Sequence, residues 1–261
     1  MNKVDNDIRI MMLTDDSPSA RVIYNRITTH YVIQNYVIEK KEGRILFVQR
    51  RIKKFGLFKV VGQLFFQSLV PRILKILSLS RIREIQSKYC MDFTKPEQDK
   101  IVEVDSVNSD DMICLLRSYN PDLILICGTR IISQRILDST PAAFINLHFG
   151  ITPGYRGVHG GYWAVASNDL ANCGVTVHNV DAGIDTGLAI KRATISVTSR
   201  DNFVTIQLVQ LGVGKELLFD AVESFANGEE MLAERLDIGS KLWGHPTLVE
   251  YVVRRVVYGV K

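Results

Sequence analysis

Two polar side chains near the middle of the chain, Asn146 and His148, are spaced to act on one reactant. They stand two residues apart in an apolar stretch that is typical of a strand, so both side chains point to the same side. The loop that follows, 149–157, contains several glycines and Pro153, which indicates a long shaped loop rather than a tight turn. A lone histidine at such a place is usually a hydrogen-bonded structural residue, and that alternative stays open.

A second block, Gly174–Gly187, contains two acids, Asp181 and Asp185, beyond another expected strand. Aspartates between glycines ordinarily accept hydrogen bonds from turn N–H groups, so a structural role is one interpretation. In the other interpretation, one carboxylate enters the same cleft as the amide and the imidazole. These three groups suit transfer of an acyl group to an amine, because donors stabilise the oxyanion and a carboxylate takes up the amine proton.

The positioning of these residues requires strands that end at one edge of a sheet, and the apolar pattern predicts them. Apolar runs alternate with segments of helical spacing, which favours an α/β fold with a Rossmann-like, mostly parallel sheet flanked by helices. Ligands bind at the carboxyl ends of the strands in such sheets. The expected strands are 9–13, 31–39, 100–104, 122–127, 143–147, 174–179 and 188–197, and the expected helices end near 28, 119, 139, 167 and 227.

The formal charge of +4 hides two oppositely charged parts of the chain. The basic segment Arg44–Lys88 contains eleven Lys and Arg and a single acid, Glu84, for a net +10, so the remainder carries −6. We expect this segment to form two or three helices with breaks near Gly56, Gly62 and Pro71.

The basic segment is also the most apolar part of the chain. Its longest run without charge, Val60–Pro71, has twelve residues where a spanning helix needs about 20, so no transmembrane segment is expected. Four apolar residues fall on one stripe, which favours an amphipathic helix. They are Phe58, Val61, Phe65 and Leu69. Aromatic residues interleave with the bases, so a surface for RNA or for peripheral contact with an anionic membrane is an open alternative to a solvated helix face.

Composition excludes several classes of protein. A chain of 261 residues that is 46% hydrophobic indicates one globular domain, or one domain with a small appendage, and excludes a disordered chain. The four cysteines lie far apart without a CxxC pair, which argues for a reducing compartment and against a zinc site or disulfides. The polar start, 1–10, lacks the apolar region of a secretory signal, so a cytoplasmic protein is expected.

Taken together, the two blocks resemble the formyltetrahydrofolate-dependent formyltransferase family. That family carries N-x-H-x-[SG]-x-L-P-x-[YFW]-[RK]-G and then G-V-T-[VI]-H-x-[VM]-D-x-G-x-D-x-G, and Asn146–Gly157 and Gly174–Gly187 match both in order. Thr152 replaces the usual Leu before Pro153. The resemblance runs from Ile8 to Asn227 and is weakest across the basic segment. It implies a catalytic domain at 1–227 with an insertion at 44–88, and a C-terminal extension at 228–261.

The resemblance implies a role for each matching residue. Asn146 would hold the formyl oxygen, His148 would stabilise the oxyanion, and Asp185 would orient the folate and help to remove the amine proton. The cosubstrate would be N10-formyltetrahydrofolate, bound largely by a backbone loop, with no metal and no covalent enzyme intermediate. His178, within a strand, is assigned to structure, and Asp181 is expected to shape its loop. The residues expected to bind the cosubstrate are Gly128, Thr129, Arg130, Ile131, Ile132 and Asp181, and those expected to line the acceptor side are Tyr155, Arg156, Gly157 and His159.

Within the family, the resemblance favours the branch that acts on nucleotide-linked amino sugars. The segment after Asn227 is short for the C-terminal barrel of the tRNA enzymes, and the shorter purine enzyme lacks the insertion. We therefore expect a cytoplasmic, homodimeric N-formyltransferase of bacterial surface-polysaccharide (O-antigen) synthesis, with an acceptor such as GDP-perosamine and no nucleic-acid partner. The insertion would cover the fold and help to hold the diphosphate. A glycinamide ribonucleotide- or methionyl-tRNA-type enzyme, or a binding protein on the same fold, are the alternatives.

Overall fold

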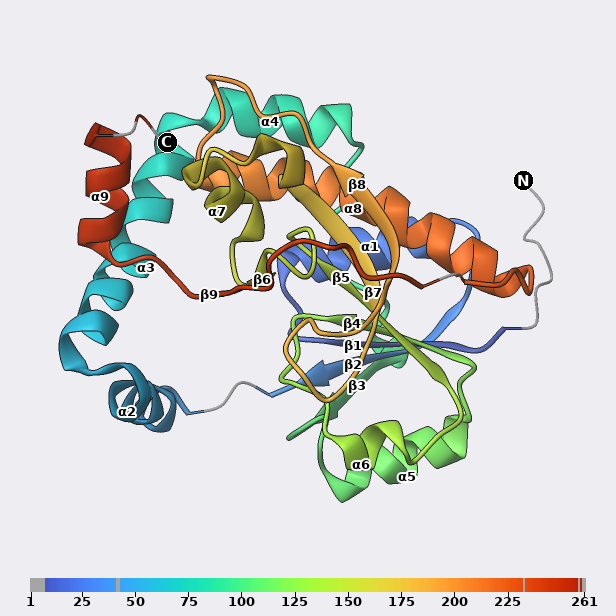
Figure 1. Ribbon diagram of the computed structural model, residues 1–261. Coiled ribbons are helices and arrows are strands. Elements are labelled where there is room, and N and C mark those ends of the chain that lie inside the picture. Colours follow the sequence, from blue (N-terminus) through green and yellow to red (C-terminus); the bar gives the residue numbers. More distant parts are fainter. Residues whose placement is uncertain (1–7, 41–42, 232, 258, 260–261) are drawn as a thin grey trace.

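A seven-stranded sheet forms the centre of the computed structural model (Figure 1), which describes residues 8–40, 43–231, 233–257 and 259. Its strand order is β3-β2-β1-β4-β5-β7-β8, and β3 to β5 pair in parallel while β7 and β8 are antiparallel. The strands of the sheet are β1 (Ile10–Thr14), β2 (Ile33–Glu39), β3 (Ile101–Val104), β4 (Leu123–Cys127), β5 (Ala143–His148), β7 (Gly174–Asn179) and β8 (Ala189–Thr194). The predicted Rossmann-like α/β fold is confirmed.

Helices cover both faces of this sheet (Figure 1). Helices α1 and α8 pack on one face through a core that includes Leu125 and Leu218, and α5 and α6 pack on the other through Met112 and Ile136. The helices are α1 (Pro18–Ile27), α2 (Arg44–Phe55), α3 (Leu57–Leu77), α4 (Leu79–Lys88), α5 (Asp110–Tyr119), α6 (Gln134–Leu137), α7 (Gly160–Ala166), α8 (Phe203–Ala226) and α9 (Leu248–Val257), with short 3₁₀ turns at η1 (Gln98–Lys100) and η2 (Leu170–Asn172).

Helix starts follow polar capping residues. Ser17 accepts the Ala20 N–H at the start of α1, and Ser109 accepts the Met112 N–H at the start of α5. At α8, Asn202 forms a reciprocal capping box that satisfies N–H groups of the first turn.

The basic segment folds as three helices, as predicted, but two of the expected breaks are wrong. The chain breaks at Gly56, which has a φ of 83°, and at Ser78. Gly62 and Pro71 lie inside α3. Thr247 packs closely against Gly62, and a Cβ at residue 62 would lie only 3.1 Å from the Thr247 Cβ. The glycine therefore serves this close contact and does not end the helix. Buried apolar side chains on both sides of Pro71 keep the helix continuous.

Helix α3 is apolar on two sides. The predicted stripe faces outward, and its first residue, Phe58, is 93% exposed. A second row that includes Val60, Phe66 and Val70 is buried instead. The predicted helix is confirmed, but the prediction that it is amphipathic is wrong, because apolar side chains cover both its exposed and its buried sides. With 21 residues, α3 is long and apolar enough to cross a membrane by length and composition, alone among the described helices.

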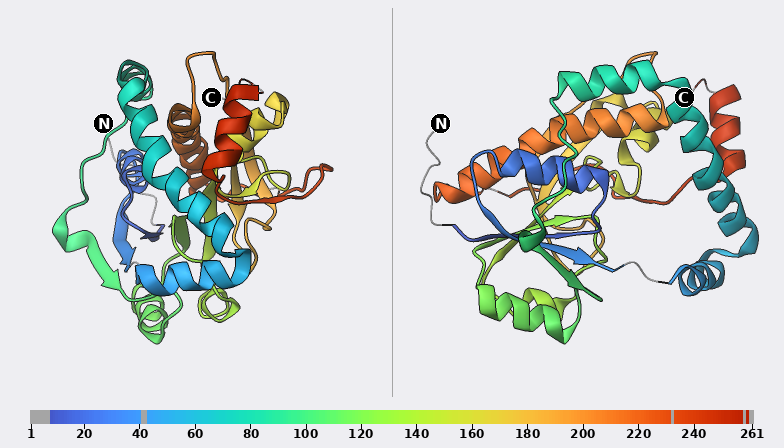
Figure 2. Two further views of the ribbon diagram at one scale, coloured as in Figure 1. Left: turned by 90° about the vertical axis from the view of Figure 1, so that its left-hand side faces the viewer. Right: turned by 180° about the vertical axis from the view of Figure 1, so that it is seen from behind.

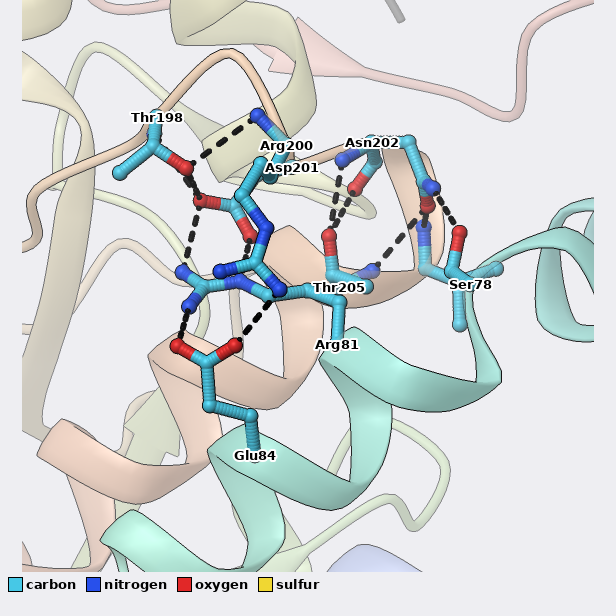
Figure 3. A network of polar contacts seen from close by, with 9 residues as sticks. Ser78, Arg81, Glu84, Thr198, Arg200, Asp201, Asn202 and Thr205 are labelled. Carbon is cyan, nitrogen blue, oxygen red and sulfur yellow. Dashed lines mark hydrogen bonds and ion pairs between the residues drawn. The ribbon is translucent and has the colours of Figure 1, made fainter.

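Helix α4 is fixed to the start of α8 by a polar network (Figure 3). Arg81 donates to both oxygens of the fully buried Asp201 carboxylate, at 2.9 and 3.0 Å, and also pairs with Glu84. The Asn202 amide donates to the Ser78 hydroxyl at 2.6 Å. The end of the basic segment is therefore anchored to the body that carries the sheet.

The C-terminal extension folds back onto the loop after β5. Strand β9 (Leu242–Trp243) pairs in parallel with β6 (Arg156–Gly157), and Trp243 stacks on Trp163 and Tyr155 with ring centroids 4.7 and 5.8 Å apart. Tyr251 of α9 packs against Phe66 of α3. The expected boundary at residue 227 coincides with the end of α8, and the division into domains stays a prediction.

Candidate active site

A cleft of about 530 Å³ opens where β4 and β5 end, beside the loop that follows β7. Asn146, His148 and Asp185 all line it, so the structure brings together the three residues predicted to be catalytic. The other predicted residues that line the cleft are Gly128, Thr129, Arg130, Ile131, Ile132, Gly157, His159 and Asp181. The cleft lies at the carboxyl ends of parallel strands, where open α/β sheets bind ligands.

Antiparallel pairing of β5 with β7 places His178 opposite Asn146. Asn146 Nδ2 lies 3.1 Å from His178 Nε2, and His178 Nδ1 lies 2.7 Å from the carbonyl oxygen of Asn179. Because a carbonyl only accepts, Nδ1 donates to it and Nε2 accepts from the Asn146 amide. An amide NH₂ has two hydrogens, so the second N–H of Asn146 is free to bind a reactant.

His148 is buried, and both of its ring nitrogens face protein groups. Nε2 donates to the carbonyl oxygen of Tyr155 at 2.6 Å, and Nδ1 lies 3.5 Å from Oδ2 of Asp185. Burial lowers the pKa of His148 more than the Asp185 carboxylate raises it. The ring is therefore neutral at pH 7, with an unprotonated Nδ1 that faces the carboxylate.

Gly150 makes this placement of His148 possible. A Cβ at residue 150 would lie 2.3 Å from the Tyr155 carbonyl oxygen and 2.8 Å from His148 Nε2. Only glycine lets the chain pass this close to the His148–Tyr155 hydrogen bond.

Asp185 adopts a left-handed conformation with a φ of 50°, which is uncommon for a residue other than glycine. Its Oδ2 accepts the Gly157 N–H at 2.8 Å, and its Oδ1 lies 3.6 Å from His178 Nε2. Burial by itself would raise the pKa of Asp185, but the attraction to His148, which acts when that ring takes up a proton, and the Gly157 N–H hold it well below its usual range. The carboxylate is therefore ionised at neutral pH and lies between two histidines.

The loop 128–132 forms one wall of the cleft. Glu39 fixes it, because one carboxylate oxygen accepts the Arg130 backbone N–H at 3.0 Å and the other lies 3.2 Å from the guanidinium Nε. Within the part of the chain that the structure describes, the backbone N–H groups of Thr129, Ile131 and Ile132 have no hydrogen-bond partner. They are available to acceptor atoms of a ligand.

Asp181 shapes the loop that carries Asp185. Its Oδ1 accepts the Gly183 N–H at 3.0 Å and the Thr186 hydroxyl at 2.6 Å. These two bonds close the loop from both sides of Asp185. Asp181 therefore acts on the cleft through the loop conformation, although it also lies at the rim.

Tyr155 and Arg156, predicted to contact the acceptor, do not line the cleft. The Tyr155 hydroxyl donates to Asp169 at 2.7 Å, and its buried ring stacks on Trp243. The Arg156 guanidinium donates to the Ile184 carbonyl oxygen at 3.2 Å. The placement of Tyr155 differs from the prediction because the loop turns its ring inward, under the C-terminal extension, and only its carbonyl reaches His148.

His159 lines the cleft, as predicted, and contacts two protein side chains. Its Nδ1 accepts from the Gln207 amide at 3.0 Å, so its Nε2 carries the proton and donates to His245 Nδ1 at 2.9 Å. Burial lowers the pKa of His159 to about 3 and that of His245 to about 4. Both rings are therefore neutral at pH 7.

Sequence reasoning missed one histidine of this region, His245. The structural role of His178 stays a prediction, and the structure adds that its ring contacts both Asn146 and Asp185. His245 belongs to the extension and had no signal in the sequence, because its contact with His159 depends on the pairing of β9 with β6.

The arrangement can polarise a carbonyl and accept a proton at one place. Asn146 offers an amide N–H, Asp185 offers an ionised carboxylate, and His148 Nδ1 can receive a proton from that carboxylate. No group of three or more metal-binding side chains occurs among the residues that the structure describes. These residues support acyl transfer that relies on hydrogen bonding and proton transfer.

Residues 80–222 match the family model described as formyl transferase, over more than half of the chain. Methionyl-tRNA formyltransferase from Koribacter versatilis is 29% identical over 153 residues, which are 58% of this chain and 46% of that protein. The corresponding enzyme from Desulfotalea psychrophila is 31% identical over 129 residues, 49% of this chain and 40% of that protein. The chain thus spans less than half the length of these curated relatives.

Solved structures share the fold. A sugar N-formyltransferase from a Shewanella species has a TM-score of 0.57 at 13% identity and covers 91% of this chain and 76% of its own. Glycinamide ribonucleotide transformylase 1 from Symbiobacterium toebii also has a TM-score of 0.57, at 18% identity, over 89% of this chain and 96% of its own. The family match begins in α4 and contains Asn146, His148 and Asp185. On this match and this geometry, the chain belongs to the formyl transferase family.

Proposed function

We propose that the chain moves a formyl group from N10-formyltetrahydrofolate to the amine of a small acceptor. The observation that carries the proposal is the meeting of Asn146, His148 and Asp185 at one cleft, within the residues that match the family. Membership of the family supports a folate-dependent enzyme, and the arrangement of the three side chains supports direct transfer.

The reaction forms a bond from the amine nitrogen to the formyl carbon and breaks the bond from that carbon to N10. Asn146 donates its free amide N–H to the formyl oxygen as negative charge develops there. Asp185 accepts the proton that the amine loses and shares it with His148 Nδ1, 3.5 Å away. His148 then carries positive charge beside the oxyanion, and the proton is finally delivered to N10 of the departing folate.

The wall around loop 128–132 fits a flat ring system with acceptor atoms on its edge. Ile23 and Ile126 give this end of the cleft apolar surface, and Thr129, Ile131 and Ile132 offer backbone N–H groups. When bound, the folate would supply the activated formyl group. Glu39, through its two contacts with Arg130, would hold the loop in place for binding.

For the acceptor we propose a nucleotide-linked amino sugar, with GDP-perosamine as the specific compound to test. Support comes from the C-terminal extension, whose strand β9 pairs with β6 directly before Val158 and His159, two residues that line the cleft. Further support is the shared fold with structures named as sugar N-formyltransferases, over about nine-tenths of this chain. The sequence relatives favour initiator methionyl-tRNA as the second candidate.

The test is transfer itself. The protein is incubated with N10-formyltetrahydrofolate and, separately, nucleotide-linked amino sugars, glycinamide ribonucleotide and methionyl-tRNA, and mass spectrometry looks for the gain of one formyl group. Asp185→Asn should abolish the gain, and Asp111→Asn, an exposed acid of α5, is the matched control. Formylation of the tRNA alone would replace the proposed acceptor, and no formylation of any compound would overturn the proposed activity.

A further inference from the structure

One side of the molecule carries an exposed apolar surface. Among the described residues, most of the large apolar side chains that are exposed belong to α2, α3 and α9. These three helices lie together on the side that the left panel of Figure 2 turns toward the viewer. We call this surface the helical face and define it by Phe47, Phe58, Phe65, Leu69, Ile76 and Val256. It lies outside residues 80–222, so the family match does not account for it.

Exposure on this face is high for side chains of this kind. Phe58 is 93% exposed, Ile76 69% and Val256 76%. Phe65 and Leu69 continue the row along α3, one helical turn apart. An apolar surface of this extent is rare on a monomeric protein in water and marks a surface that meets another apolar phase.

Positive charge surrounds the apolar row. Residues 44–77 contain eight Lys and Arg and no Asp or Glu. Among the described residues, no carboxylate pairs with the exposed Lys53, Lys54, Lys59, Arg72 or Lys75. The partner of the helical face must therefore be negatively charged as well as apolar.

Helix α3 is held along the surface of the folded body. Its Gln63 donates to the His245 carbonyl oxygen at 2.6 Å and accepts from Arg51 at 2.6 Å. Its Phe66 packs edge-on against Phe203 and at a tilt against Tyr251, with ring centroids 4.9 and 5.3 Å away. A helix that makes these contacts cannot cross a bilayer without leaving the fold. Its exposed row can therefore meet a membrane only with the helix lying along the membrane surface.

We propose that the helical face docks on the surface of an anionic lipid bilayer. Aromatic and aliphatic side chains enter the boundary between headgroups and acyl chains, and the lysines meet the anionic headgroups. Two contacts suit that boundary: the Arg51 guanidinium lies 5.4 Å from the Phe47 ring and the Lys54 ammonium 5.4 Å from the Phe55 ring. A second copy of this chain would bring the same positive charges face to face across a two-fold axis, which disfavours it as the occupant.

The experiment is sedimentation of the full chain with lipid vesicles. Binding is expected to vesicles of phosphatidylcholine mixed with phosphatidylglycerol, to be weak with phosphatidylcholine alone, and to fall as salt is added. Each of Lys53→Gln, Lys54→Gln and Lys59→Gln should weaken binding about fivefold, the equivalent of about 1 kcal/mol per basic residue. The double variant Phe58→Ser/Phe65→Ser should weaken it at least as much, whereas Tyr119→Ser on α5, an exposed aromatic residue away from the helical face, should not.

Three results would overturn the proposal. They are no binding to anionic vesicles at low salt, binding that the lysine and phenylalanine variants leave unchanged, and a wild-type dimer in analytical ultracentrifugation that Phe58→Ser/Phe65→Ser converts to a monomer while vesicles stay unbound. All substituted side chains are exposed, and circular dichroism of each variant checks the fold. Formyl transfer to a soluble acceptor is measured without vesicles, so a failure here is distinct from a failure of the proposed function.

Discussion

Replacement of Gly150 by alanine tests whether the placement of His148 controls the cleft. The new Cβ would lie 2.3 Å from the Tyr155 carbonyl oxygen, where real Cβ contacts stay beyond 3.0 Å, so the chain must open by at least about 0.7 Å. It would also lie 2.8 Å from His148 Nε2, which breaks the bond that orients the ring. A displacement near 1 Å can cost about 100-fold in rate. Forced packing of this kind costs about 1–3 kcal/mol of unfolding free energy.

The assay compares turnover and urea unfolding in matched glycine variants. Gly239→Ala is the control, because a Cβ there meets nothing within 4 Å. We expect Gly150→Ala to remain folded with a turnover about 100-fold lower, and Gly239→Ala to resemble the wild type in both measurements. A tenfold change in rate corresponds to about 1.4 kcal/mol of activation free energy. A folded Gly150→Ala protein with turnover within about twofold of the wild type would show a much smaller effect and would refute the assigned role of the His148–Tyr155 bond.

Three further predictions follow from the same structure. Asp185→Asn should lower turnover by about 100-fold or more while folate still binds, since it removes the proton acceptor, and retained turnover would contradict its role. The neutral pair His159 and His245 should make the protein less stable as pH falls from 6.5, because the unfolded chain then takes up protons that the folded pair, with pKa values of about 3 and 4, does not. Urea midpoints between pH 7.5 and 5 measure this, and His245→Gln should flatten the slope. Asn202→Ala removes the cap of α8 and should lower the free energy of unfolding by about 1 kcal/mol, measured as a lower urea midpoint.

The sheet and the three central site residues could be predicted because their signals are local. Asn146 and His148 are two residues apart on one strand, and side chains at that spacing lie on the same side of a sheet. Asp185 could be predicted only from its place in the second motif, because β7 runs antiparallel to β5 and its end lies beside Ile145, away from the end of β5. The loop after β7 carries Asp185 back to His148. Apolar runs such as Leu123–Cys127 are buried on both faces, which fixes them as inner strands without knowledge of the rest of the fold.

The sequence left open what depends on contacts between distant segments. His178 reaches Asn146 only because β7 runs antiparallel to β5 in one particular register. Tyr155 turns inward because Trp243, far along the chain, stacks on its ring. The breaks in the basic segment were misplaced for the same reason, since packing of Thr247 against Gly62 outweighs the helix-breaking tendency of glycine.

The proposed chemistry and the proposed membrane contact can be separated experimentally because they use opposite ends of one row of hydrogen-bonded polar groups. Arg51 donates to Gln63, Gln63 donates to the His245 carbonyl, and His245 accepts from His159 at the cleft. Gln63 is 3% exposed, so it belongs to neither surface, and substituting it should disturb both. Arg51 lies near the rings of Phe47 and Phe55. Within the described part of the chain, no hydrogen bond, ion pair or ring contact joins the side chains of Phe58 or Phe65 to these groups. Variants at Phe58 and Phe65 are therefore the ones that report on docking alone.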